Sequence, residues 1–177
     1  MLVSAFCFCA CSKHIPAVYE VTGMSLSNAN NEGQNPADAA TNPVPKKAYA
    51  IKMNLSETMK IKRDGDANEN GFINEDRLIS LNIFSLDSFD ATHPAGTSLN
   101  SYFLTQLVSS ASISAFVSKG DIGGGKLKDN NYTDNWSTDQ YLFLMTPPAM
   151  VGNQSFVLRF DLSDGRHFCD TVDVNLY

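Results

Sequence analysis

Apolar and polar residues alternate along much of this chain with the two-residue period of a β-strand. The alternation is found in residues 48–55, 77–86, 156–162 and 168–176. Side chains two positions apart on a strand share a face, so each segment presents one apolar face to a core. Shorter apolar runs predict further strands at residues 17–23, 113–118 and 140–145. The pattern predicts a protein built mainly from strands.

The last two strands are predicted to form a hairpin around residues 163–165. A two-residue loop would pair Phe160 with Cys169 and place the two apolar sets on opposite faces. A three-residue loop pairs Phe160 with Phe168 and places both sets on one face. Because a slip of one residue inverts a strand, we expect the three-residue loop, with Gly165 left-handed in a bulge.

The same rule assigns individual side chains to faces. Ile79, Leu81 and Ile83 are expected to point into the core. The hairpin register places Asp170 on the apolar face, opposite Leu158, and the sequence gives no reason for a carboxylate there beyond a strand edge or a bulge.

The order of elements predicts an immunoglobulin-like antiparallel β-sandwich with one short helix. The helix is expected behind Thr97-Ser98, because apolar residues follow helical spacing at Leu99, Tyr102, Phe103 and Leu107. Residues 25–47 contain few apolar side chains and are predicted to be a flexible linker, since they bury too little surface to offset the entropy of ordering. The predicted division is therefore a signal segment at 1–11, a short strand and tether at 12–47, and the sandwich at 48–177.

The N-terminus reads MLVSAFCFCACS, an apolar run that leads into three alternating cysteines. A small residue, Ala10, precedes Cys11, as a lipoprotein signal peptidase would need. This predicts export, acylation of Cys11 and a lipid-anchored location in the cell envelope. No basic residue precedes Lys13, although a secretory leader has a basic start. One explanation is that the true start lies upstream and that Met1 is internal to the leader. The alternative is an apolar terminus that packs or binds metal, for which Cys-x-Cys-x-Cys lacks a second group of ligands.

Composition narrows the class of protein. The 177 residues, 43% of them hydrophobic, are enough for one core. The formal net charge of −6 argues against a nucleic-acid partner, whose binders present basic surfaces. With the leader removed, Cys11 would be acylated and Cys169 would be the remaining thiol, so the fold must be stable without an internal disulfide.

The segment DANENGFINEDR, residues 66–77, resembles the calcium loop of EF-hands and dockerins. Its oxygen donors at loop positions one, three, five and seven are Asp66, Asn68, Asn70 and the carbonyl of Phe72. The twelfth position should carry a bidentate carboxylate and is Arg77, with Asp76 one residue early. Calcium is therefore the one cofactor the sequence suggests. The alternative is a polar hairpin loop, which Asn, Asp and Gly form for backbone reasons alone.

Three aromatic residues, Tyr132, Trp136 and Tyr141, lie within an Asn- and Asp-rich stretch. Rings flanked by amides suit glycan binding, and they equally suit the anchoring of a long loop. The Gly-rich stretch at 120–127 lacks the Ser or Thr of a phosphate-binding loop. Because no nucleophile, base or paired carboxylate stands out, the chain is predicted not to be an enzyme.

Several segments together resemble a known family. They are the cysteine near the start, the strand Tyr19–Gly23, the Pro-rich gap, the strand led by Tyr49, the stretch Ser85–Leu99 and the closing hairpin Phe160–Phe168. The chain resembles a family of Bacteroidetes lipoproteins of undefined function. The resemblance implies an envelope location and a β-rich fold, and it transfers no catalytic residues.

The sequence therefore predicts a lipid-anchored envelope protein whose β-sandwich binds a ligand or a partner. One alternative is a fimbrial or assembly accessory protein that pairs through its sheet edges. A second alternative is a calcium-stabilised glycan-binding module. The expected partners are the membrane and a glycan or an envelope protein.

Overall fold

The computed structural model describes residues 17–39, 43–61, 72–74, 76–107, 113–115, 120–121, 127–128, 131–132 and 139–177. The strands within this part are β1 (Ala17–Asn30), β2 (Ala37–Asp38), β3 (Tyr49–Ile61), β4 (Phe72–Asn74), β5 (Arg77–Ser85), β6 (Phe103–Leu107), β7 (Ile113–Ala115), β8 (Gly120–Asp121), β9 (Leu127–Lys128), β10 (Asn131–Tyr132), β11 (Asp139–Leu144), β12 (Gly152–Leu162) and β13 (His167–Leu176). Helical structure in these residues is limited to one 3-10 turn, η1 (Asn100–Tyr102). The protein is mainly β, as predicted.

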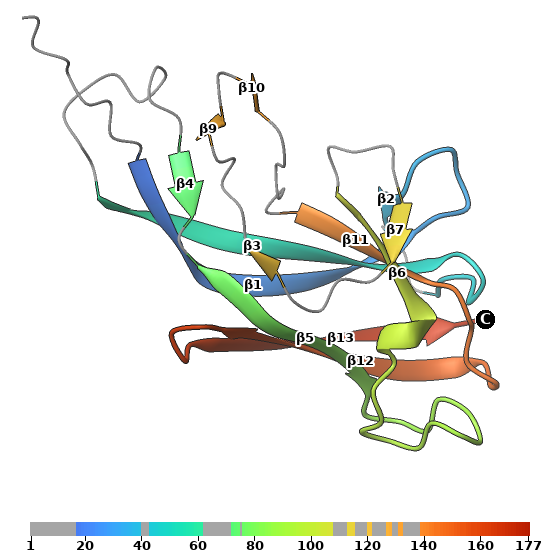
Figure 1. The fold of residues 1–177 in the computed structure, drawn as a ribbon. Coiled ribbons are helices and arrows are strands. Elements are labelled where there is room, and N and C mark those ends of the chain that lie inside the picture. Colours follow the sequence, from blue (N-terminus) through green and yellow to red (C-terminus); the bar gives the residue numbers. More distant parts are fainter. Residues whose placement is uncertain are drawn as a thin grey trace, which may run out of the picture.

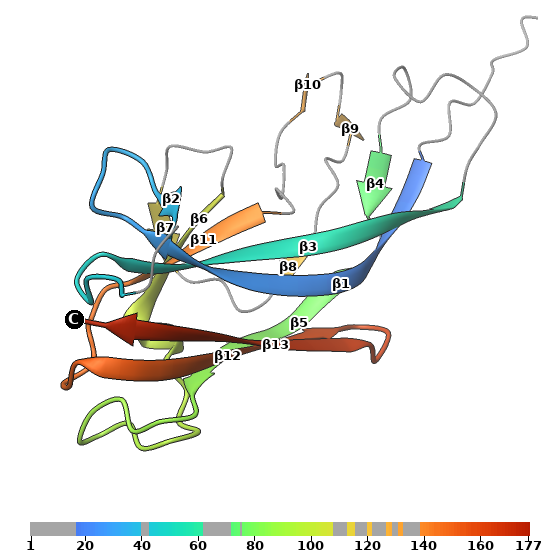
Figure 2. The ribbon, with the colours of Figure 1, turned by 180° about the vertical axis from the view of Figure 1, so that it is seen from behind.

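Two sheets face each other as a sandwich (Figures 1 and 2). The first, the N-terminal sheet, has the strand order β2-β1-β3-β11-β6-β7, with β4 parallel to the start of β1. The second, the C-terminal sheet, has the order β13-β12-β5-β8. Strands β9 and β10 form a separate pair. The chain passes from one sheet to the other after β4, β5, β7 and β11, and it returns from β8 to β11 by way of the separate pair β9 and β10. Neither sheet is therefore built from one continuous stretch of sequence.

The core lies between the sheets and is lined by the predicted alternating positions. Tyr49, Ile51, Met53 and Leu55 of β3 are buried on one face, and the apolar residues of β12 and β13 face them. Phe156 is the centre of an aromatic cluster, with ring centroids 5.4 Å from Tyr49, 6.2 Å from Phe89 and 6.1 Å from Phe103. Each buried ring removes a large apolar surface from water, which is the main source of stability in such a core.

The C-terminal hairpin has the predicted register. Phe160 pairs with Phe168, and Leu158 pairs with Asp170. The amide of Leu162 donates to the carbonyl of Arg166 at 2.8 Å, which closes a three-residue loop, and Gly165 has a φ of 89°. Only glycine adopts this left-handed conformation without a steric penalty. The hairpin prediction is confirmed.

The predicted helix at residues 99–107 is wrong. Apart from the η1 turn, this segment is strand β6, which pairs with β11. Leu99 is buried beside β5, to which its amide donates a 2.8 Å hydrogen bond at the carbonyl of Ile83. Phe103 and Thr105 are buried on the inner face, so the two-residue period of the strand overrides the helical spacing of the apolar residues.

The predicted inward orientation of Ile79 is also wrong. Ile79 is exposed, and Leu78 is buried in its place. Between β12 and β5 the register shifts from the pair Asp161–Ser80 to the pair Leu162–Leu78, so β5 carries one extra residue at this point. This bulge inverts the faces of the strand beyond it.

Residues 25–47 are not a flexible tether where the structure describes them. Strand β1 continues to Asn30, and Met24 and Leu26 pack against the core. Val44 is buried and forms a parallel bridge with Leu176. The prediction failed because strand pairing with β3 satisfies the backbone of this polar segment, which its composition did not indicate. The sandwich therefore begins at β1, well before residue 48.

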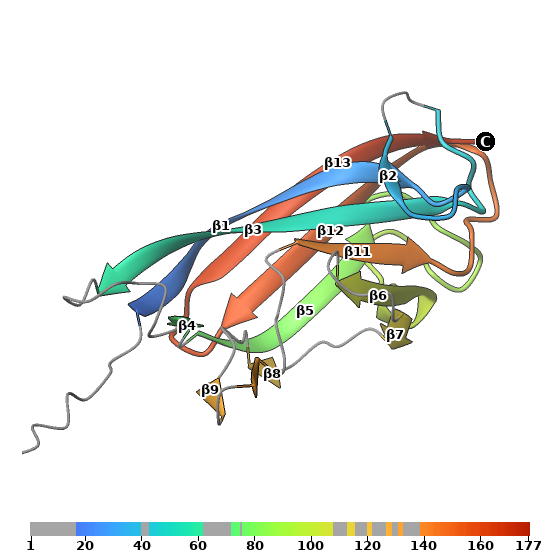
Figure 3. The same ribbon diagram turned by 90° about the horizontal axis from the view of Figure 1, so that it is seen from above.

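Strands β1 and β13 lie side by side along one side of the sandwich (Figure 3), and side chains bond across their edges. Asp170 of β13 accepts a 2.8 Å hydrogen bond from the amide of Leu26, and Asn28 donates a 2.9 Å bond to the carbonyl of Asp173. These bonds join the free edge of β1 to the free edge of β13. They explain the carboxylate on the apolar face of the last strand.

On the opposite side of the sandwich, the side chain of Asn100 bonds to the edge of β5 in the same way. The side-chain oxygen of Asn100 accepts from the amide of Ile83 at 2.8 Å, and its side-chain nitrogen donates to the carbonyl of Leu81 at 2.9 Å. The amide group of Asn100 thus occupies the place that a further strand residue would take. Edges closed in this way offer few free backbone groups to another chain.

Candidate functional site

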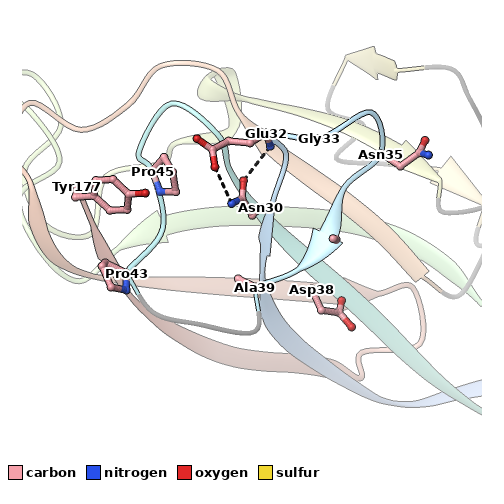
Figure 4. A pocket seen from close by; sticks show the side chains of 10 residues that line it. Asn30, Glu32, Gly33, Asn35, Asp38, Ala39, Pro43, Pro45 and Tyr177 are labelled. Atoms are coloured by element: carbon pink, nitrogen blue, oxygen red, sulfur yellow. Dashed lines mark hydrogen bonds between the residues drawn. The ribbon is translucent and has the colours of Figure 1, made fainter.

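A pocket of about 300 Å³ lies at the end of the sandwich where β1 ends at Asn30. Its lining residues are Asn30, Glu32, Gly33, Asn35, Ala37, Asp38, Ala39, Pro43, Pro45 and Tyr177. One wall is the turn that joins β1 to β2, and the other is the segment at 43–45 together with Tyr177 (Figure 4). The volume lies at the lower end of the range for small-molecule sites.

The first wall is held by a reciprocal pair of hydrogen bonds. The side-chain oxygen of Asn30 accepts from the amide of Glu32 at 2.9 Å, and its side-chain nitrogen donates to the Glu32 carboxylate at 3.2 Å. Asparagine forms such turns readily because its side chain reaches the backbone two residues ahead. The carboxylate of Glu32 is thereby held on the Pro45 side of the turn (Figure 4).

The second wall is fixed to the end of β13. The amide of Val44 donates to the carbonyl of Asn175 at 2.8 Å, and the amide of Tyr177 donates to the carbonyl of Val44 at 3.2 Å. A third bond, 2.9 Å long, joins the amide of Lys46 to the carbonyl of Tyr177. Tyr177 is fixed through its backbone, and the residue as a whole is 59% exposed. Each wall therefore belongs to a different sheet, and the pocket lies between their ends.

The side chains that line the pocket carry more negative than positive charge. Its lining contains two carboxylates, Glu32 and Asp38, and no basic residue among those the structure describes. Lys52 on the outer face of β3 is 3.2 Å from Asp38 and balances its charge. The excess charge is therefore that of Glu32, whose carboxylate already accepts a bond from the neutral amide of Asn30.

Tyr141, which belongs to the predicted aromatic site, does not line this pocket. Tyr141 lies on the outer face of the N-terminal sheet, half-buried beside Phe143, with 6.2 Å between ring centroids. Tyr132 lies in β10, where its backbone pairs with Leu127. Trp136 lies outside the described residues. The structure therefore gives no geometry that joins these three rings.

The predicted calcium ligands fall mostly outside the described residues, as Asp66, Asn68 and Asn70 do. Phe72 lies in β4, where its backbone pairs with Ala17. No cluster of three or more His, Cys, Asp or Glu side chains suited to a metal occurs among the described residues. The calcium site stays a prediction.

Asp76, the remaining predicted ligand, has another role in the structure. One carboxylate oxygen accepts from the amide of Val21 at 2.6 Å, and the other bonds to the guanidinium of Arg166. Arg166 also donates to the carbonyl of Val21 at 2.5 Å. The pair closes the edge of β1 near its start and joins it to the C-terminal hairpin.

Cys11, the predicted acylation site, lies outside the described residues. Among the residues that are described, no helix has the length and apolar character needed to cross a membrane. Cys169 is a free, exposed thiol.

A second polar cluster lies in the loop after β5. The Asp90 carboxylate accepts bonds from the amides of Thr92 and His93 at 2.8 Å, from the His93 ring at 2.9 Å and from the Tyr102 hydroxyl at 3.2 Å. The hydrogen bond from His93 is the main cause that holds the pKa of Asp90 well below its ordinary value. Both oxygens of Asp90 accept hydrogen bonds from the residues around it, so the cluster stabilises the conformation of the loop. The neighbouring residue, Phe89, is buried in the core.

The pocket was not predicted because all of its described lining residues except Tyr177 lie in residues 25–47, the segment interpreted as a linker. Two signals were present. The alternation of β1 continues through Met24 and Leu26, and a lone apolar residue, Val44, stands between two prolines. Only the three-dimensional pairing of Val44 with β13 shows that the second wall is built.

The fold is a two-sheet β-sandwich with a small pocket between its sheet ends. Residues 21–173 match the family described as a domain of unknown function, DUF5034, and the chain belongs to that family. No curated protein and no solved structure matches this chain. The family match covers nearly the whole sandwich, including most of β1 and the first wall of the pocket.

Proposed function

We propose that this protein is a lipid-anchored protein of the cell envelope whose β-sandwich binds a small ligand in the pocket between the sheet ends. The observation that carries the proposal is the pocket itself, with two walls fixed by backbone bonds to different sheets. A site that is formed before binding loses less entropy when a ligand arrives.

The position of the pocket suits a membrane-attached protein. Ala17 begins β1 only six positions after Cys11, a stretch of at most about 20 Å of chain. Strand β1 then runs fourteen residues, about 45 Å, to Asn30 at the pocket. An acyl chain on Cys11 would therefore place the start of β1 toward the membrane and the pocket at the distal end, where solutes arrive.

The proposal includes two further points. The protein is one of the Bacteroidetes lipoproteins that its sequence resembles, and its sandwich is immunoglobulin-like. The alternative of an assembly protein that pairs through its sheet edges is less favoured, because Asp170 and Asn100 already bond to edge groups of β1 and β5. Ligand binding at the sheet ends leaves these bonds intact.

Two measurements test the proposal separately. Metabolic labelling with an alkyne fatty acid should label the wild type and leave Cys11→Ala unlabelled, and equal labelling would refute the anchor. A thermal-shift screen against chemically diverse small molecules should find compounds that stabilise the wild type and leave a Glu32→Ala/Tyr177→Ala double variant unchanged. If every stabilising compound acts equally on both proteins, or none stabilises the wild type, the pocket is not a ligand site.

A further inference from the structure

We propose that the pocket binds one saccharide unit, stacked on the Tyr177 ring and hydrogen-bonded to the Glu32 carboxylate. The inference rests on the proposed function and names the ligand class for that site. A pyranose ring has faces of C–H groups and an edge of hydroxyls, so its binding site needs an apolar plane beside planar acceptors.

The apolar plane is formed by the second wall. Tyr177 is 59% exposed, and Pro43 and Pro45 stand beside it (Figure 4). Proline rings and an aromatic face present C–H groups and a π surface without a flexible side chain to order. Binding against them costs little conformational entropy.

The planar acceptor is formed by the first wall. The Glu32 carboxylate has one oxygen bonded to the Asn30 amide and another oxygen with no bond to the described residues. Two oxygens in one plane match a pair of adjacent sugar hydroxyls, and charge-assisted bonds of this kind are roughly twice as strong as neutral ones. Asn30 fixes the direction of the carboxylate from behind, so its acceptor geometry is set before binding.

The same lining disfavours two other classes of small ligand. Anions meet two carboxylates and, among the described lining residues, no lysine or arginine. Wholly apolar ligands would cover the Asn30 and Glu32 side chains and the Tyr177 hydroxyl without offering them a hydrogen bond.

A cationic ligand, such as a polyamine, is the competing class. The protein carries a net charge of −6, which attracts cations in general. Within the pocket, however, Lys52 balances Asp38, and one exposed carboxylate contributes little to binding a cation in water. The ring and the prolines carry no charge, so the site is better matched to a neutral ligand with both C–H and hydroxyl faces.

The experiment is calorimetric titration of the full chain with glucose, galactose, mannose, N-acetylglucosamine and their short oligomers, with spermidine as the cation. Tyr177→Phe keeps the ring and loses only the hydroxyl, so its affinity should lie between those of the wild type and of Tyr177→Ala. Tyr177→Ala removes the ring and should weaken binding about tenfold, and Glu32→Ala should do so by a similar factor. Met150→Ala, which alters a side chain that is 66% exposed and outside the pocket, serves as the matched control and should bind normally. Circular dichroism of each variant checks that it is folded.

Each outcome decides the inference. Saccharide binding that depends on the Tyr177 ring and on Glu32 supports it. Spermidine binding that is lost in Glu32→Ala, with no saccharide bound, overturns the saccharide class while the pocket remains a ligand site. Saccharide binding that Tyr177→Ala leaves unchanged overturns the stacking site. If no saccharide binds but the thermal-shift screen yields a pocket-dependent ligand of another class, the saccharide is wrong and the proposed function stands.

Discussion

Asn100 offers the sharpest test of how the edge of β5 is closed. Its side chain makes two hydrogen bonds to the backbone of that strand, at 2.8 Å and 2.9 Å, and a longer one of 3.4 Å to the side chain of Asn82. A neutral hydrogen bond contributes about 1 kcal/mol net, so the two backbone bonds together contribute about 2 kcal/mol. The substitution Asn100→Ala should lower the free energy of unfolding by that amount.

Asn100→Asp is a more selective change because the two side chains have the same shape. The retained oxygen still accepts from the amide of Ile83, but the second oxygen now faces the carbonyl of Leu81. This replaces a hydrogen bond by two opposed acceptors and should also cost about 2 kcal/mol at neutral pH. Below about pH 4 the introduced carboxyl group is protonated and can donate to the carbonyl of Leu81, so the deficit relative to the wild type should shrink.

Thermal melting followed by circular dichroism measures both effects. For a chain of this size, about 2 kcal/mol corresponds to a fall of about 4–8 °C in Tm. Asn153→Ala, an exposed position on β12, is the matched control and should change the stability by less than about 0.5 kcal/mol. If Asn100→Ala melts with the control, or if Asn100→Asp shows the same deficit at every pH, the side chain does not act as a substitute for a strand.

Three further predictions concern the core and the hairpin. Phe156→Ala removes the ring that contacts Tyr49, Phe89 and Phe103, so urea unfolding should show a loss of about 3–5 kcal/mol. Gly165→Ala places a side chain on a residue with a φ of 89° and should lower the free energy of unfolding by about 1 kcal/mol. Gly33 has no positive φ, so Gly33→Ala should lower it by less. Equal losses of stability would contradict the strain at Gly165. Burial is the main cause that raises the pKa of Tyr49 above its usual range, so the folded state keeps a proton that the unfolded state releases near pH 10. The free energy of unfolding should therefore fall as the pH rises above about 10, and Tyr49→Phe should reduce that fall. At pH 7 the same variant should cost about 1–2 kcal/mol, because it leaves the side-chain oxygen of Asn28 without its 2.9 Å donor. An alkaline profile that is unchanged in Tyr49→Phe would contradict this role.

The parts of the fold that sequence could predict are those set by local period and turn chemistry. The faces of β3, β12 and β13 follow from alternation, and the register of the last hairpin follows from the need to keep Phe160 and Phe168 on one face. In each case neighbouring residues carry the whole signal, so no knowledge of distant contacts was needed.

The parts that sequence could not predict depend on contacts between distant residues. Ile79 turns outward because β5 carries a bulge against β12. Leu99 and Phe103 have helical spacing, but pairing with β11 makes the segment a strand. The carboxylate of Asp170 is explained by the amide of Leu26, which is distant in sequence and donates a hydrogen bond to it. Composition alone made the pocket segment resemble a linker, although strand pairing orders both of its walls.

The central claim is that the distal pocket is where this protein meets its ligand. Backbone amide chemical shifts, followed by NMR as the saccharide panel is titrated into the full chain, test this claim most directly. We predict that the shifts concentrate at residues 30–39, at Val44 and at Tyr177, the two walls of the pocket. Shifts confined to other segments, such as those carrying Tyr132 and Tyr141, would contradict the account. The absence of any shift, both with the saccharide panel and with the compounds found in the thermal-shift screen, would contradict it as well.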